Sequence, residues 1–91
     1  MKPEKSRVLV AEDNPVNFEL VRDLLESLGH EVGWAKDGQH ALDMAATGRF
    51  ELLLLDLHSP KLDGLQVVRA LRASPPSNHL KVFALPPPAI P

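Results

Sequence analysis

The stretch "LLLLDLHSPKLDG", residues 52–64, decides how the chain folds. Four consecutive leucines end at Asp56, and Pro60 and Gly64 follow within the next eight residues. A short apolar run bounded by turn residues is typical of a strand that is buried on both faces, as in the centre of a parallel sheet. Asp56 is therefore either a solvated loop residue or a reactive group at the rim of a sheet.

Apolar runs and helical patterns alternate on both sides of this stretch. The predicted strands are four short apolar runs: residues 8–11, 32–35, 52–55 and 80–85. Strands that alternate with helices imply right-handed crossovers and a parallel sheet. We therefore expect one α/β domain over residues 7–85, with a lead-in at 1–6 and a proline-rich tail at 86–91.

Helical signals fill the segments between the strands. The first helix is predicted to start at Pro15, with Asn14 or Asp13 as its N-cap, and to end at Gly29. A second helix is predicted to follow the turn at Asp37. Apolar spacing indicates these buried faces: Val21, Leu24, Leu25 and Leu28; Ala41, Leu42 and Ala45; Leu65, Val68 and Leu71.

Composition and charge exclude several classes of function. The 91 residues suffice for one small domain, and a net charge of −2 offers no broad basic field for nucleic acid or an anionic membrane. The sequence has no Cys, which excludes disulfides and thiolate catalysis. Its longest early apolar run is too short for a signal peptide or a membrane span. We expect a soluble, cytoplasmic protein. Trp34 is expected to pack at a strand edge, and because no stacking platform surrounds it we assign it no nucleic-acid role.

Three carboxylates follow the predicted strands. Glu12 and Asp13 come directly after the first strand, and Asp56 ends the third. Ligands of open parallel sheets bind beyond the carboxyl ends of the strands, where these side chains would converge if the two strands are neighbours. Their mutual repulsion favours a divalent cation with oxygen ligands, such as Mg²⁺. Helix capping by the acids before Pro15 is the simpler alternative for the first pair.

Together, "VLVAEDNPVN" (8–17) and "LLLLDLHSPKLDG" (52–64) resemble the receiver domain of response regulators, most of all receivers of hybrid histidine kinases. The resemblance implies the flavodoxin-like (CheY-like) three-layer fold with strand order 2-1-3-4. It implies that Asp56 accepts a phosphoryl group, and that Glu12, Asp13, Asp56 and the backbone carbonyl of His58 hold Mg²⁺. A histidine kinase or phosphotransfer protein would be the partner. The domain would not be an enzyme beyond weak self-phosphorylation and self-dephosphorylation.

The sequence departs from the receiver pattern near its end. Pro86 occupies the position where receivers carry Ser or Thr, and it has neither a hydroxyl nor an N–H. The fourth helix, fifth strand and fifth helix of the family, and the lysine of that strand, have no counterpart. Lys81 is expected at the wrong end of its strand, roughly 16 Å from the rim. Lys61 is closer but is expected to be solvated. Each lost donor commonly lowers a transfer rate by ~10²–10³.

Without a fifth helix, one sheet face is expected to lack its cover. We expect a homodimer or a partner to cover this face.

A second hypothesis follows, in which the chain is a truncated receiver that no longer accepts phosphate and serves as an interaction or dimerisation module. A third is that the chain is a fragment, or that its reading frame is altered after the fourth strand, because six of nine prolines fall in residues 75–91.

Overall fold

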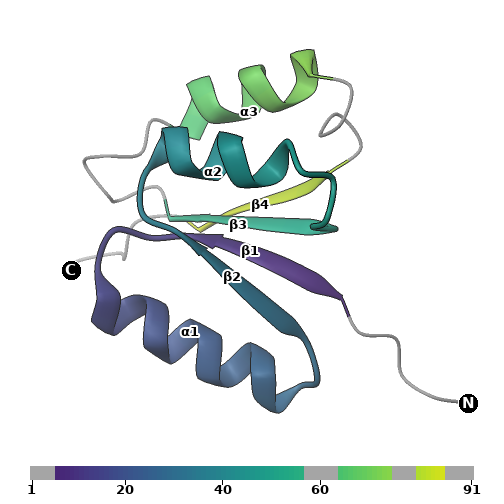
Figure 1. Ribbon diagram of the computed structural model, residues 1–91. Coiled ribbons are helices and arrows are strands. Elements are labelled where there is room, and N and C mark those ends of the chain that lie inside the picture. Colours follow the sequence, from purple (N-terminus) through teal and green to yellow (C-terminus); the bar gives the residue numbers. More distant parts are fainter. Residues whose placement is uncertain (1–5, 57–63, 75–79, 86–91) are drawn as a thin grey trace, which may run out of the picture.

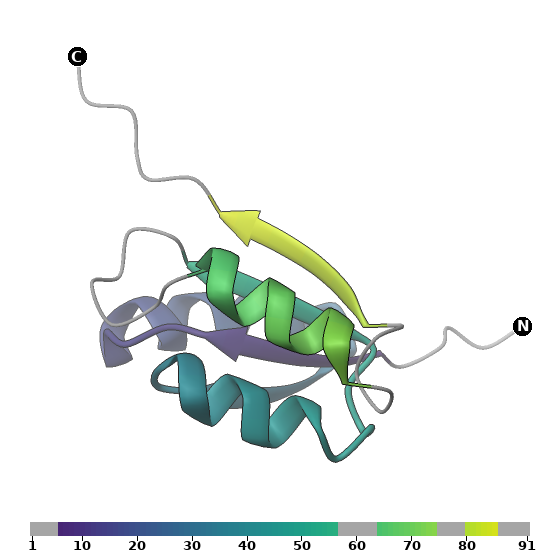
Figure 2. The same cartoon turned by 90° about the horizontal axis from the view of Figure 1, so that it is seen from above.

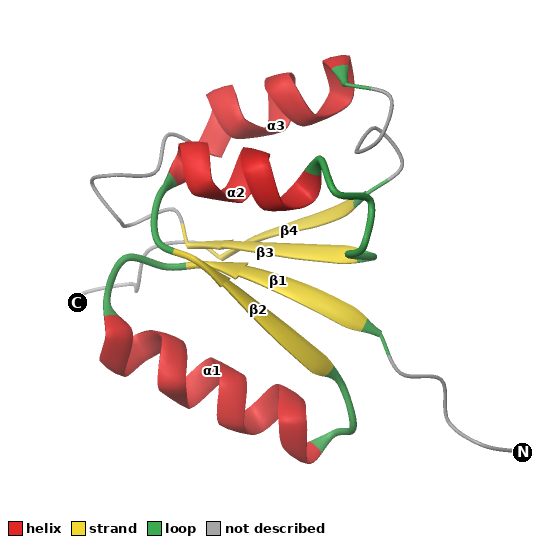
Figure 3. Cartoon of the chain, in the orientation of Figure 1, coloured by secondary structure: helices red, strands yellow, loops and turns green. Residues whose placement is uncertain are grey.

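A computed structural model describes residues 6–56, 64–74 and 80–85. Strands and helices alternate along the chain, and each helix links one strand to the next (Figures 1 and 3). The strands are β1 (Arg7–Ala11), β2 (Glu31–Ala35), β3 (Leu52–Asp56) and β4 (Lys81–Leu85). The helices are α1 (Pro15–Ser27), α2 (Gly38–Ala45) and α3 (Gly64–Ala73).

All strand pairs are parallel, and the sheet order is β2-β1-β3-β4. The predicted order 2-1-3-4 is confirmed. β3 lies inside the sheet, which explains its unbroken run of leucines. Leu53 and Leu55 are fully buried on one face, and Leu52 and Leu54 are half-buried on the other. A residue run without polar alternation is expected where both faces of a strand are covered.

Helices cover both faces of the sheet and form two cores. α2 and α3 lie side by side on one face (Figure 2), over Leu9, Leu53 and Leu55. α1 lies on the opposite face, where Phe18 packs with Val8 and Val10. The arrangement has three layers, as expected. Within the described residues, no helix is long and apolar enough to cross a membrane.

The helical faces differ from the expected ones at three positions. In α1, Phe18, Val21 and Leu25 meet the sheet, whereas Leu24 is 62% exposed and Leu28, which caps the helix, is 64% exposed. In α3, Val67 and Leu71 are buried and Leu65 is exposed. The predicted helices are correct, but in each helix the apolar side chains cover a wider part of the surface than the sheet contacts. Only the side chains along one edge of that apolar surface pack on the sheet.

The helix ends agree with the sequence. Asn14 is the N-cap of α1, and its Oδ1 accepts the N–H groups of Val16 and Asn17 at 2.9 and 3.3 Å. Asp37 caps α2 in the same way, with a bond of 2.8 Å from the His40 N–H. Gly29 has a φ of +92°, the left-handed geometry that ends a helix. These caps fix the chain where it leaves β1 and β2.

Candidate functional site

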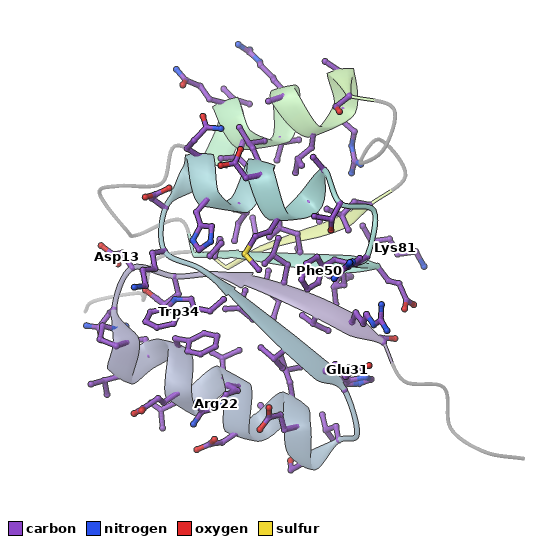
Figure 4. The ribbon with its side chains drawn as sticks, in the orientation of Figure 1. Asp13, Arg22, Glu31, Trp34, Phe50 and Lys81 are labelled. Carbon is purple, nitrogen blue, oxygen red and sulfur yellow. The ribbon has the colours of Figure 1, made fainter. Side chains whose placement is uncertain are left out.

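The carboxyl end of the sheet brings two of the predicted segments together. Ala11 of β1 pairs with Leu55 of β3, so Glu12 and Asp56 each follow a paired residue by one position. Asp13 is one residue further along. Neighbouring strands lie about 4.8 Å apart, so the backbones of Glu12 and Asp56 lie side by side at this edge. Figure 4 shows Asp13 at the same edge.

Glu12 is the only buried charged residue among those described, with 5% of its surface exposed. β2 holds its backbone on both sides. The Glu12 N–H donates to the Ala35 carbonyl at 2.9 Å, and the Trp34 indole Nε1–H donates to the Glu12 carbonyl at 2.7 Å. A fully buried carboxylate is rare unless it is paired or hydrogen-bonded. The fold therefore builds this acid into a defined place.

The Glu12 carboxylate also contacts the start of α1. Its Oε2 accepts the backbone N–H of Asn14 at 3.1 Å. Asn14 in turn begins the helix, because its carbonyl accepts the Phe18 N–H at 3.0 Å. Asp13 thus lies between two residues whose backbones are fixed, one by β2 and one by α1. Asn14, and neither of the two acids, is the N-cap of α1, and the site prediction for Glu12 and Asp13 stays a prediction.

The donor set suits a hard divalent cation. Glu12 and Asp13 supply adjacent carboxylates at the edge where Asp56 ends β3, and Mg²⁺ prefers such oxygen ligands while it retains several waters. No cluster of three or more His, Cys, Asp or Glu side chains that could hold a metal occurs in the described part of the chain. The Asp56 side chain and His58 lie outside that part, so the predicted four-ligand set remains a prediction.

The lysine prediction agrees with the sheet register. Lys81 pairs with Leu52 at the start of β3, and Figure 4 shows it at the end of the sheet opposite Asp13. It cannot pair with a phosphoryl group at the carboxyl edge. Two other residues bear on the departure from the receiver pattern. These are Lys61 and Pro86, and both lie outside the described residues.

Trp34 has contacts that the sequence did not reveal. The Phe18 ring stacks on it at a centroid distance of 4.6 Å and an interplanar angle of 9°. Nothing in the sequence indicated this pair, because the two rings are distant in sequence and come together only when α1 packs beside β2. A lone Trp three residues before the helix cap Asp37 gave no signal of its bond to Glu12.

Comparison with known sequences decides the family. The profile described as "Response regulator receiver domain" matches residues 8–86. The chain belongs to the response regulator receiver family. Receiver domains are phosphoacceptor signalling modules of two-component systems rather than classical enzymes. The Polar-differentiation response regulator DivK of Brucella anthropi is 37% identical to this receiver over 78 residues.

Solved receiver structures share the fold. The receiver domain of the sensor histidine kinase PA1611 from Pseudomonas aeruginosa is 33% identical, with a TM-score of 0.81, and its structure has a magnesium ion coordinated in the active site cleft. The chemotaxis protein CheY4 of Vibrio cholerae is 27% identical, with a TM-score of 0.80. The matches cover 89% of this chain and 66% and 68% of those chains, respectively. DivK is matched over 86% of this chain and 63% of its own length.

Proposed function

We propose that this receiver accepts a phosphoryl group on Asp56 from the phosphohistidine of a histidine kinase or phosphotransfer protein. The observation that carries the proposal is the β1–β3 register, in which Ala11 pairs with Leu55, the residues directly before Glu12 and Asp56. A buried Glu12 beside Asp13 supplies the negative charge that a divalent cation needs.

The reaction is a displacement at phosphorus. A carboxylate oxygen of Asp56 forms the new P–O bond, the P–N bond of the donor breaks, and the donor imidazole leaves with the bonding electron pair and takes up a proton. Glu12, Asp13, Asp56 and the His58 carbonyl would hold Mg²⁺, and the ion would supply positive charge against the transferring phosphoryl group. Glu12 is held before the donor arrives, because its backbone is bonded to β2 and its carboxylate accepts the Asn14 N–H.

Intact mass after incubation with Mg²⁺ and acetyl phosphate tests this function. We expect a gain of one phosphoryl group in the wild type, its removal by hydroxylamine, and no gain in Asp56→Asn. Asp43→Asn is the matched control, because Asp43 is exposed on α2, away from the carboxyl edge, and its bond from the Gln39 amide (2.9 Å) can persist. Folded protein that gains no phosphoryl group in any condition would refute the proposal.

A second function, as an interaction module, is favoured by an exposed apolar surface. The α1 flank, defined as Val16, Leu20, Leu24 and Leu28, has exposed fractions of 62–68%. Phe83 of β4 is 58% exposed and pairs with Leu54, so it lies on the sheet face that carries α1. Exposed apolar patches often mark an interface.

The two functions predict different responses to one substitution. Under the interaction function, Asp56→Asn leaves partner binding or self-association unchanged, whereas Leu24→Asp lowers it. Under the phosphoacceptor function, Asp56→Asn abolishes signalling output. Light scattering coupled to size-exclusion chromatography measures self-association directly, and a monomeric wild type at high concentration would argue against the homodimer.

A further inference from the structure

A stacked pair of aromatic rings, with a cation near each ring, lies beside the acidic pair. The Arg22 guanidinium lies 5.8 Å from the Phe18 ring centroid, Phe18 stacks on Trp34, and the Lys36 ammonium lies 5.1 Å from the Trp34 centroid. Phe18 of α1 and Lys36, the residue after β2, thus both contact the Trp34 indole, and Arg22 of α1 contacts Phe18. Cation–π and stacked pairs each favour such an arrangement.

The indole N–H donates to the Glu12 carbonyl at 2.7 Å. This bond is short for an N–H donor, and the pair is partly buried, so water competes weakly for either group. Together with the bond from the Glu12 N–H to the Ala35 carbonyl, this bond holds the Glu12 backbone against the end of β2. Asp13 follows directly after this held backbone.

We infer that Trp34 is a positioning residue for the divalent-cation site, which acts through the Glu12 backbone and touches no ligand itself. The inference rests on the proposed function, because it requires the cation at Glu12 and Asp13. Groups that orient metal ligands commonly change metal affinity by about 10- to 100-fold when they are removed. A single lost hydrogen bond to a carbonyl lies at the lower end, so we expect affinity to fall about tenfold.

Calorimetric titration with Mg²⁺, and with Mn²⁺ as a tighter probe, tests the inference. Trp34→Phe removes the N–H and keeps a ring for Phe18 to stack on. Phe18→Leu is the matched control, because it removes the stacked ring and leaves the N–H. We expect Trp34→Phe to bind the cation about tenfold more weakly, whereas Phe18→Leu melts at lower temperature but binds within twofold of the wild type. Thermal melts without cation separate the two effects.

A second replacement isolates the N–H alone. The sequence has one Trp, so benzothienylalanine, which carries sulfur in place of the indole N–H, can replace it throughout the chain without touching another site. We expect the loss of affinity to persist in this protein while the stack is retained. It also answers the case in which Trp34→Phe does not fold.

The outcomes distinguish failure of the positioning role of Trp34 from failure of the proposed cation site. Glu12→Gln should abolish cation binding; a wild type that binds no cation, or a Glu12→Gln protein that binds as tightly, overturns the site and the inference together. A wild type that binds cation, with the benzothienyl protein binding equally well, overturns the inference alone. Affinity losses in Phe18→Leu and Trp34→Phe that follow their losses in melting temperature would show a merely structural role and overturn it too.

Discussion

We expect one added methyl group at Gly33 of β2 to lower the stability of the fold through a single identifiable contact. A Cβ built on Gly33 would lie 2.7 Å from both Cε1 and Cζ of the Phe50 ring and 3.3 Å from the Met44 Cε. Contacts of 2.7 Å between carbons cannot persist, so the ring must move. Overpacking of this kind typically costs about 1–3 kcal/mol. Gly33→Ala should therefore strain the core between β2 and α2.

The loss of stability from overpacking is partly offset by a backbone contribution. Alanine in a strand is favoured over glycine by about 0.5–1 kcal/mol, because glycine loses more backbone freedom on folding. Phe50 also borders a surface hollow of about 310 Å³, lined by Arg7, Glu31 and Arg49 among others, into which the ring can shift. We expect a net loss of about 1 kcal/mol, which in a domain of this size lowers the melting temperature by about 4–8 °C.

A double-mutant cycle with Phe50→Leu tests this reasoning, because it should reverse the sign of the stability change caused by Gly33→Ala. Leucine is shorter than the ring, so in the Phe50→Leu background Gly33→Ala should stabilise the fold by about 0.5–1 kcal/mol. Equilibrium urea unfolding, followed by circular dichroism, gives the four free energies. The expected coupling is about 1–3 kcal/mol. A coupling below about 0.5 kcal/mol would show that the ring contact does not govern this position.

The remaining predictions concern α1 and the site. Leu25→Ala should lower the free energy of unfolding by about 2 kcal/mol, whereas Leu24→Ala, on the exposed flank, should change it by less than about 0.5 kcal/mol; urea unfolding of the two neighbours compares them directly, and equal losses would contradict the observed helix face. Asn14→Ala should cost about 1 kcal/mol through loss of the N-cap, and Asn14→Asp should retain the stability; equal melting temperatures for all three proteins would exclude a capping role. Pro86→Thr should raise the rate of phosphoryl transfer from acetyl phosphate by up to about 10²-fold, because it restores a hydroxyl donor; an unchanged rate in folded protein would show that the missing hydroxyl is not limiting.

Local chemistry made much of the fold predictable. The Asn14 cap, the Asp37 cap and the left-handed Gly29 follow from the preferences of single residues for particular backbone positions. The four leucines of β3 predicted an internal strand, because only burial on both faces permits an unbroken apolar run. These features depend on a few neighbouring residues, so the sequence contains all the information that they need.

Tertiary contacts decided what the sequence left open. Leu24 and Leu25 both belong to the apolar arc of α1, and only the angle at which the helix meets the sheet shows that Leu25 is the one that packs. Glu12 and Asp13 were recognisable as acids that follow a strand, but the bonds that hold the Glu12 backbone come from β2, which lies more than twenty residues away in sequence. Spacing rules have no means to detect such a contact.

The end of β2 divides two tasks between successive residues. Side chains alternate across a sheet, so Gly33 and Ala35 face α2 while Trp34 faces α1. Gly33 leaves room for the Phe50 ring, and Trp34 holds the Glu12 carbonyl. Because the two residues act on opposite faces, Gly33→Ala should lower stability without changing cation affinity, whereas loss of the Trp34 N–H should lower cation affinity and cost only the stability of one partly buried hydrogen bond. Stability and the geometry of the acidic pair are therefore separable in this strand, although the residues that govern them are adjacent.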